Sequence, residues 1–120
     1  MDSDVLKSAG IDFEKGIARF LGDRKLYESI LVNFLNDTTF TLASEAFKNE
    51  KYTCLYECVH MLKGVAGNTD MTMLFRSTGA LCDYLRKCED PDREVVILLF
   101  REIEEAYYSA MLGIVAAKEA

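Results

Sequence analysis

The chain has 120 residues, half of them apolar, which is enough for one compact domain with one hydrophobic core across 1–120. Its formal net charge of −6 disfavours nucleic acid and anionic membrane surfaces as partners. The longest uncharged apolar-rich stretch, 106–117, is shorter than the roughly 20 residues that span a bilayer. The acidic start also differs from the basic opening of a signal peptide, so we expect a cytoplasmic protein with no membrane contact.

The cysteines are expected to be free thiols, because a chain of this size does not need disulfides and shows no export signal. Their spacings also differ from the two-residue spacing of the usual metal knuckle. We therefore expect no metal site at these four residues, which are Cys54, Cys58, Cys82 and Cys88.

The fold class predicted by composition and pattern is all-α. Helix-forming residues are abundant, Pro91 is the only proline, and no stretch alternates in the manner of a strand. Two short helices are predicted first, at about 3–9 and 12–21, ended by Gly10 and Gly22.

A long helix is predicted next, beginning at the capping residue Asp23 and running to about Phe47. One apolar stripe at 3.6-residue spacing supports it, formed by Tyr27, Ile30, Leu31, Phe34, Leu35, Thr38 and Leu42. The following helix is predicted to begin near Tyr52 and to end at Asn68.

Two more helices complete the prediction. One starts after Asp70, which we expect to be its N-cap, and stops before Pro91 because the residue before a proline disfavours the α conformation. Its stacked face contains Leu74, Thr78, Leu81 and Leu85. The last helix, about 92–117, gathers on one face Val95, Val96, Leu99, Ile103, Ala106, Ala110, Ile114 and Ala117. Four long amphipathic helices with short connections favour an antiparallel four-helix bundle, with the short N-terminal helices covering one end.

The only histidine, His60, is predicted to point away from the core. At about 100° per residue it lies about 160° from Leu62. The side facing the core would be formed by Leu55, Cys58, Val59, Leu62, Val65 and Ala66. The outer face around the imidazole would carry Tyr56, Glu57, Lys63, Gly64 and Gly67.

The two glycines on this outer face are unexpected, because each costs about 1 kcal/mol relative to alanine inside a helix. Bare backbone at Gly64 and Gly67 indicates that something approaches the imidazole closely. Imidazole can act as a nucleophile, and Lys63, one turn on, could neutralise a phosphoryl group on it. From the residues alone, the alternative is an ordinary surface histidine beside an ordinary lysine.

A longer pattern resembles a known family. The segment His60-Met61-Leu62-Lys63-Gly64, followed by Gly67-Asn68 and by Leu74, resembles the H-x-L-K-G signature of histidine-containing phosphotransfer (HPt) domains. The stretch from Gly10 through Asp23 to Phe34 is similar to the family's N-terminal half, so the resemblance covers roughly 10–88. It departs from the family pattern at Asp70, where many members have glycine, and at Cys82, where some have a glutamine near the imidazole.

The resemblance implies roles for the residues of this face. His60 would be the phosphoacceptor and Lys63 would balance the phosphoryl charge. Arg86 matches a position that is basic in some members. The face that docks a receiver domain would include Gly64, Gly67, Tyr56, Cys82 and Arg86.

The implied activity is exchange of a phosphoryl group between His60 and a receiver-domain aspartate in a two-component phosphorelay. The partners would be a response-regulator receiver domain, a hybrid histidine kinase, or both. The chain shows no phosphate-binding loop and no acidic cluster suited to Mg²⁺, so we expect a phosphoryl carrier without an ATP site or cofactor, and Mg²⁺ on the receiver.

Two alternatives belong to other classes. A non-catalytic helical module could use the same face only to bind a receiver. A di-iron bundle would use Glu57-x-x-His60, but such a site needs two motifs of this kind and the chain has one histidine. Ligation by Cys58 with His60 is disfavoured because the two lie about 160° apart on the helix.

Overall fold

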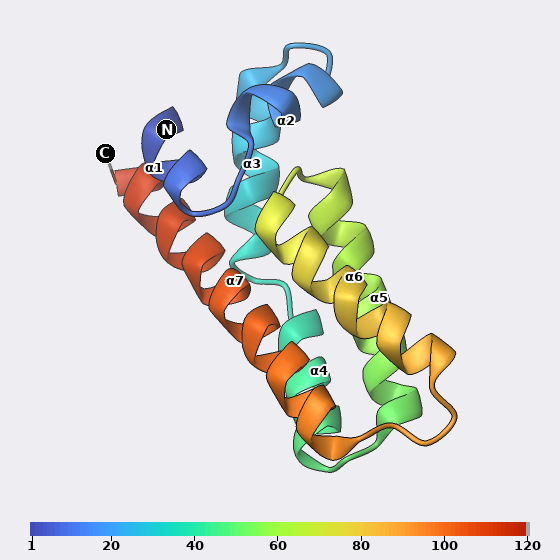
Figure 1. Cartoon of the computed structure of the whole chain (residues 1–120). Coiled ribbons are helices and arrows are strands. Elements are labelled where there is room, and N and C mark those ends of the chain that lie inside the picture. The colour runs from blue at the N-terminus through green and yellow to red at the C-terminus, as the bar shows by residue number, and fades with distance from the viewer. Residues whose placement is uncertain (120) are drawn as a thin grey trace.

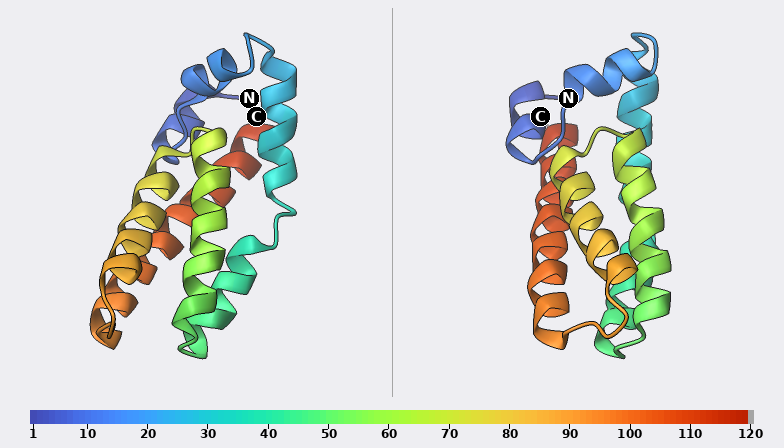
Figure 2. Two further views of the ribbon diagram at one scale, coloured as in Figure 1. Left: turned by 90° about the vertical axis from the view of Figure 1, so that its right-hand side faces the viewer. Right: turned by 45° about the vertical axis from the view of Figure 1, so that its right-hand side comes forward.

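The computed structural model describes residues 1–119, and within this range the chain is all-helical, which confirms the predicted class. Seven helices lie in the described range: α1 (Ser3–Ser8), α2 (Phe13–Arg19), α3 (Arg24–Phe34), α4 (Thr39–Lys48), α5 (Tyr52–Asn68), α6 (Thr72–Lys87) and α7 (Arg93–Glu119). Helices α4 to α7 run alongside one another, and α1 to α3 lie toward one end of them (Figures 1 and 2). None of the helices in 1–119 is both long and apolar enough to cross a membrane.

The predicted long helix from Asp23 to Phe47 is wrong, because the chain forms two helices there, α3 and α4. The break follows Phe34, where the Oδ1 atom of Asp37 accepts a hydrogen bond from the backbone N–H of Thr39 at 2.8 Å. Short polar side chains such as this one favour helix starts over helix interiors. The break also changes which side of the helix is buried, and Leu42, predicted in the stripe, is 52% exposed.

Aromatic rings join α4 to α7 in the core. The ring centroid of Phe40 lies 3.9 Å from that of Tyr107, and the centroid of Phe47 lies 4.2 Å from that of Phe100. Both pairs are stacked, so α4 packs on the long C-terminal helix through flat ring contacts. Helix α4 also contacts α5, α5 packs on α6, and α6 contacts α7.

The N-terminal helices pack closely against their neighbours through glycine. A Cβ atom placed on Gly113 of α7 would lie 2.2 Å from the Cβ of Ala9, at the end of α1. A Cβ on Gly16 of α2 would lie 2.0 Å from the ring of Tyr27 in α3. Only glycine therefore allows α1 and α2 to lie as near to α7 and α3 as they do.

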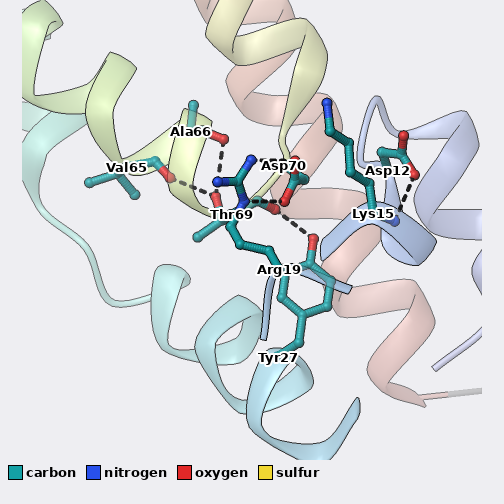
Figure 3. Close-up of polar contacts among 8 residues, drawn as sticks. All are labelled: Asp12, Lys15, Arg19, Tyr27, Val65, Ala66, Thr69 and Asp70. Atoms are coloured by element: carbon teal, nitrogen blue, oxygen red, sulfur yellow. Dashed lines mark hydrogen bonds and ion pairs between the residues drawn. The ribbon is translucent and has the colours of Figure 1, made fainter. Parts of the chain in front are cut away.

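The expectation that Asp70 is the N-cap of α6 is wrong. The cap position belongs to Met71, and Asp70 has a positive φ of 55° in the connection from α5 to α6. Its carboxylate instead accepts two hydrogen bonds from the guanidinium of Arg19 in α2 (Figure 3). The same connection receives a hydrogen bond from the buried Tyr27 Oη to the backbone carbonyl of Thr69 at 2.5 Å. Two side chains from α2 and α3 thus anchor the end of the helix that carries His60.

Candidate functional site

Helix α5 presents His60 to solvent, as its helical spacing predicts. Four residues of the predicted inner side, Leu55, Val59, Leu62 and Ala66, are fully buried, while Cys58 and Val65 are half-buried. The imidazole is exposed on the opposite side of the same helix. The burial of one face therefore determines the outward direction of the histidine.

Tyr56, one turn before His60, contacts the imidazole. The two ring centroids lie 5.8 Å apart with an interplanar angle of 16°, which is a stacked arrangement. Because Tyr56 is itself half-buried and packs against the core, it limits where the imidazole ring can turn. The predicted proximity of these two residues is confirmed.

The two glycines of the outer face have different surroundings. A Cβ on Gly64 would meet nothing within 4 Å outside its own helix turn, so the surface there is open. A Cβ on Gly67 would lie 3.1 Å from Cε2 and 3.2 Å from Cδ2 of Phe75 in α6. Gly64 leaves the surface open, whereas Gly67 leaves room for a side chain of this same chain.

Lys63 lies against α6. Its Nζ is 5.5 Å from the centroid of the Phe75 ring, within the range of a cation–π contact. Its Cε would be 3.6 Å from a Cβ on Gly79, one turn farther along α6. The lysine stem therefore crosses from α5 toward α6 and passes beside a second bare position. Lys63 forms no ion pair with any residue in 1–119.

These side chains border one shallow hollow with a volume of about 250 Å³. Its lining is formed by His60, Lys63, Gly64, Gly67, Asn68 and Phe75. The imidazole and the lysine side chain thus border the same hollow, together with the open backbone of Gly64. The hollow therefore offers a nucleophile, a positive charge and access for a partner within about one helical turn.

Cys82 is a correction to the predicted docking face, because it is 2% exposed and belongs to the core of α6. Its thiol cannot present a contact surface to a partner. Burial raises the pKa of this thiol, and the positive charge of Lys63 acts in the opposite direction.

Arg86 is exposed but borders a different groove. It donates a hydrogen bond to Asp83 on its own helix at 2.8 Å. The groove that it lines, of about 340 Å³, also contains Tyr56, Leu85 and Pro91, and does not include His60. Tyr56 lines this groove and also stacks on His60, but it is not part of the lining of the hollow at His60.

Two residues of the hollow, Phe75 and Asn68, were not predicted as site residues. Phe75 follows Leu74, a member of the buried stripe of α6, and so falls off that stripe with 43% of its surface exposed. Its place off the stripe predicts exposure but no particular contact, because other large apolar residues of the chain, such as Leu98 and Leu112, are exposed as well. Asn68 enters the resemblance only as the residue after Gly67, and because an asparagine at a helix end is common, it predicts no role in the site by itself.

The four cysteines are free, in agreement with the prediction: Cys54 is exposed, Cys58 and Cys88 are half-buried, and Cys82 is buried. Burial raises the pKa of Cys58, and the neighbouring Cys54 adds to the shift. Across 1–119, no three side chains of His, Cys, Asp or Glu converge in a way that could hold a metal ion.

Comparison with known proteins gives no relative: no protein-family model, curated protein or solved structure shows a significant match to the chain.

Proposed function

We propose that this protein is a histidine phosphotransfer protein, which accepts and donates a phosphoryl group between His60 and a receiver-domain aspartate. The observation that carries the proposal is the exposed imidazole one turn from Gly64, where a side chain would meet nothing within 4 Å. An ordinary solvated helix face has no need of that glycine, which lowers helix stability by about 1 kcal/mol. The cation of Lys63, in the same hollow, adds the charge that a phosphoryl group requires.

The proposed reaction makes one bond and breaks one. An imidazole nitrogen of His60 attacks the phosphorus of the aspartyl phosphate, and a P–N bond forms. The bond from phosphorus to the carboxylate oxygen breaks, and its electron pair leaves with the aspartate. The phosphorylated ring then releases the proton of its other nitrogen to solvent. Since phosphoryl transfer passes through a loose transition state, alignment and charge neutralisation are the main contributions that protein groups make.

The proposed setting is a cytoplasmic two-component phosphorelay, in which a receiver domain or a hybrid kinase supplies Mg²⁺ and the phosphorylated aspartate. The chain then acts as a phosphoryl carrier rather than as an autonomous enzyme. Its proposed architecture is an antiparallel four-helix bundle made by α4 to α7, capped by the N-terminal helices. The successive contacts of α4 with α5, α5 with α6 and α6 with α7 support this arrangement.

The test is incubation of the purified chain with phosphorylated receiver domains, one at a time, followed by detection of acid-labile label. The wild type should take the label, and His60→Gln should fold to the same helix content and take none. Label on the variant would place the acceptor elsewhere. Stable binding of a receiver without any label would instead favour the non-catalytic module.

A further inference from the structure

Lys63 is the cation of the proposed site, yet its ammonium is close to an aromatic ring rather than to a carboxylate. Nζ lies 5.5 Å from the centroid of Phe75. No ion pair within 1–119 includes Lys63. This distinction matters because a carboxylate partner would orient the ammonium and cancel its charge, whereas a ring face orients it and leaves the charge in place.

The ring itself has a defined position. Phe75 lies where a side chain at Gly67 would come within 3.1 Å of it, so the glycine makes the space that the ring occupies. The lysine stem passes Gly79, one turn after Phe75 on α6, where a Cβ would be 3.6 Å from Cε. Two bare positions, one on each helix, thus flank the path from Lys63 to the ring.

Packing of the core does not account for Phe75. The side chain is 43% exposed and is absent from the buried cluster that joins the helices. Its neighbour Leu74 supplies the core contact at this level of α6. The ring instead contacts two residues of the hollow, Gly67 and Lys63. Its position therefore serves the site rather than the core.

We infer that Phe75 is a positioning residue that holds the Lys63 ammonium, with its charge uncompensated, in the hollow that His60 also lines, ready to balance the phosphoryl group. The inference rests on the proposed phosphotransfer function. Gly67 acquires a role in this arrangement, as the space for the ring, that differs from the docking role of Gly64. Phe75 touches no reacting atom, so it acts only through the lysine.

The placement is tested without any phosphoryl transfer. Protons held above an aromatic face resonate upfield, so the Lys63 Cε protons should be shifted upfield from those of the other lysines in an NMR spectrum. The shift should disappear in Phe75→Leu, which keeps apolar bulk but has no ring, and persist in Phe75→Tyr. A wild-type Lys63 without the shift would overturn the inference.

The role is tested with phosphoramidate, a small phosphoryl donor that needs no partner protein. His60 attacks its phosphorus, the P–N bond to the imidazole forms, and ammonia leaves as the old P–N bond breaks. Phe75→Leu should slow labelling about two- to fivefold, the factor expected of an exposed cation–π contact. Phe75→Tyr should restore the rate. Because no partner is present, a slower rate cannot come from a lost docking contact.

The double variant separates action through the lysine from a direct effect. In a Lys63→Ala background, Phe75→Leu should produce no further slowing, since the cation that the ring positions is gone. Thermal melts of each variant control for unfolding. If wild type takes label and Phe75→Leu takes it equally fast, only the inference fails. If wild type takes no label from phosphoramidate or from any receiver, the proposed function fails and the inference fails with it.

Discussion

The guanidinium of Arg19 donates two hydrogen bonds to the carboxylate of Asp70, from Nε to Oδ2 at 2.8 Å and from Nη2 to Oδ1 at 3.2 Å. The two residues are 51 positions apart in the chain, and the contact joins α2 to the connection between α5 and α6 (Figure 3). The Asp70 side chain is only 3% exposed, so the Arg19 guanidinium, rather than water, compensates the carboxylate charge through its two hydrogen bonds. The contact therefore links the N-terminal helices to the end of the helix that carries His60.

Substitution of Asp70 should separate its ion pair from its backbone conformation. Asp70→Ala should lower the free energy of unfolding by about 1–3 kcal/mol, because the charge-assisted hydrogen bonds are lost. Asp70→Gly loses the same bonds but adopts the φ of 55° freely, so it should be about 1 kcal/mol less destabilising than alanine. Arg19→Ala should destabilise more than Asp70→Ala, because it leaves a buried carboxylate unpaired. Urea melts measure the free energy of unfolding of each variant. A lower stability of Asp70→Gly than of Asp70→Ala would contradict the prediction.

Removal of the Tyr27 hydroxyl should weaken the same junction in a pH-dependent way. Tyr27→Phe deprives the Thr69 carbonyl of its donor and should cost about 1–3 kcal/mol at neutral pH. Burial, with the Asp70 charge adding to it, raises the pKa of Tyr27 above its ordinary value. The unfolded chain therefore ionises first, and this contribution to wild-type stability is present below about pH 10 and lost as pH rises above it.

The difference in free energy of unfolding between wild type and Tyr27→Phe should accordingly shrink as pH rises above about 10. Urea melts at neutral and alkaline pH measure it. Tyr108→Phe, at an exposed phenol, is the matched control and should leave stability nearly unchanged. If the difference in free energy of unfolding between wild type and Tyr27→Phe grew with pH, the stabilising role of the protonated Tyr27 hydroxyl would be contradicted.

The sequence predicts a helix well where one apolar pattern continues along its whole length. It predicts poorly where a few residues end one helix and begin another within such a pattern. Helix α5 is predicted with its observed ends, because its apolar spacing runs unbroken from Leu55 to Ala66. The break between α3 and α4 is not predicted, because the apolar stripe continues through it. The new helix begins where the backbone N–H of Thr39 donates to Asp37, and the stripe gives no sign of this hydrogen bond. Capping at Asp23 is confirmed, because its side chain accepts from the Leu26 N–H.

The sequence predicts those features of the candidate site that depend on helix α5 alone. The outward direction of His60, the open surface at Gly64 and the nearness of Tyr56 follow from α5 alone. The burial of Cys82 and the contact of Lys63 with Phe75 depend on how α6 packs on α5, which the spacing within either helix does not specify. Asp70 shows the same limit, because its partner lies in a third helix.

The thiols should differ in reactivity in the folded state. With iodoacetamide at mildly alkaline pH, exposed Cys54 should be alkylated first and Cys82 last, because burial both shields the Cys82 thiol and raises its pKa. Peptide mass spectrometry over a time course measures the order. In urea all four cysteines should react at similar rates, which serves as the control. Equal rates for Cys54 and Cys82 without urea would contradict the burial of Cys82.

Two glycines inside helices should respond in opposite directions to the same substitution. Gly64→Ala should raise the free energy of unfolding by several tenths to about 1 kcal/mol, because the new Cβ meets nothing and alanine is the better helix former. Gly113→Ala gains the same propensity, but its Cβ would lie 2.2 Å from that of Ala9, so α1 must move away from α7. Such overpacking should cost about 1–3 kcal/mol. Urea melts of the two variants measure these changes in the free energy of unfolding. They compare the gain from helix propensity at Gly64 with the cost of overpacking at Gly113.

At Gly64, stability and phosphoryl transfer should also change in opposite directions. Gly64→Gln should leave the fold at least as stable as wild type, since its side chain projects into open space. The glutamine would nevertheless stand one turn from His60, where, in the proposed reaction, a receiver brings the reacting atoms to roughly 3–3.5 Å. Transfer from a phosphorylated receiver should therefore fall steeply in Gly64→Gln, with Gly64→Ala between it and wild type because a methyl group obstructs less. A glutamine variant that is destabilised and fully active would show that Gly64 serves the packing of its own chain rather than the approach of a partner.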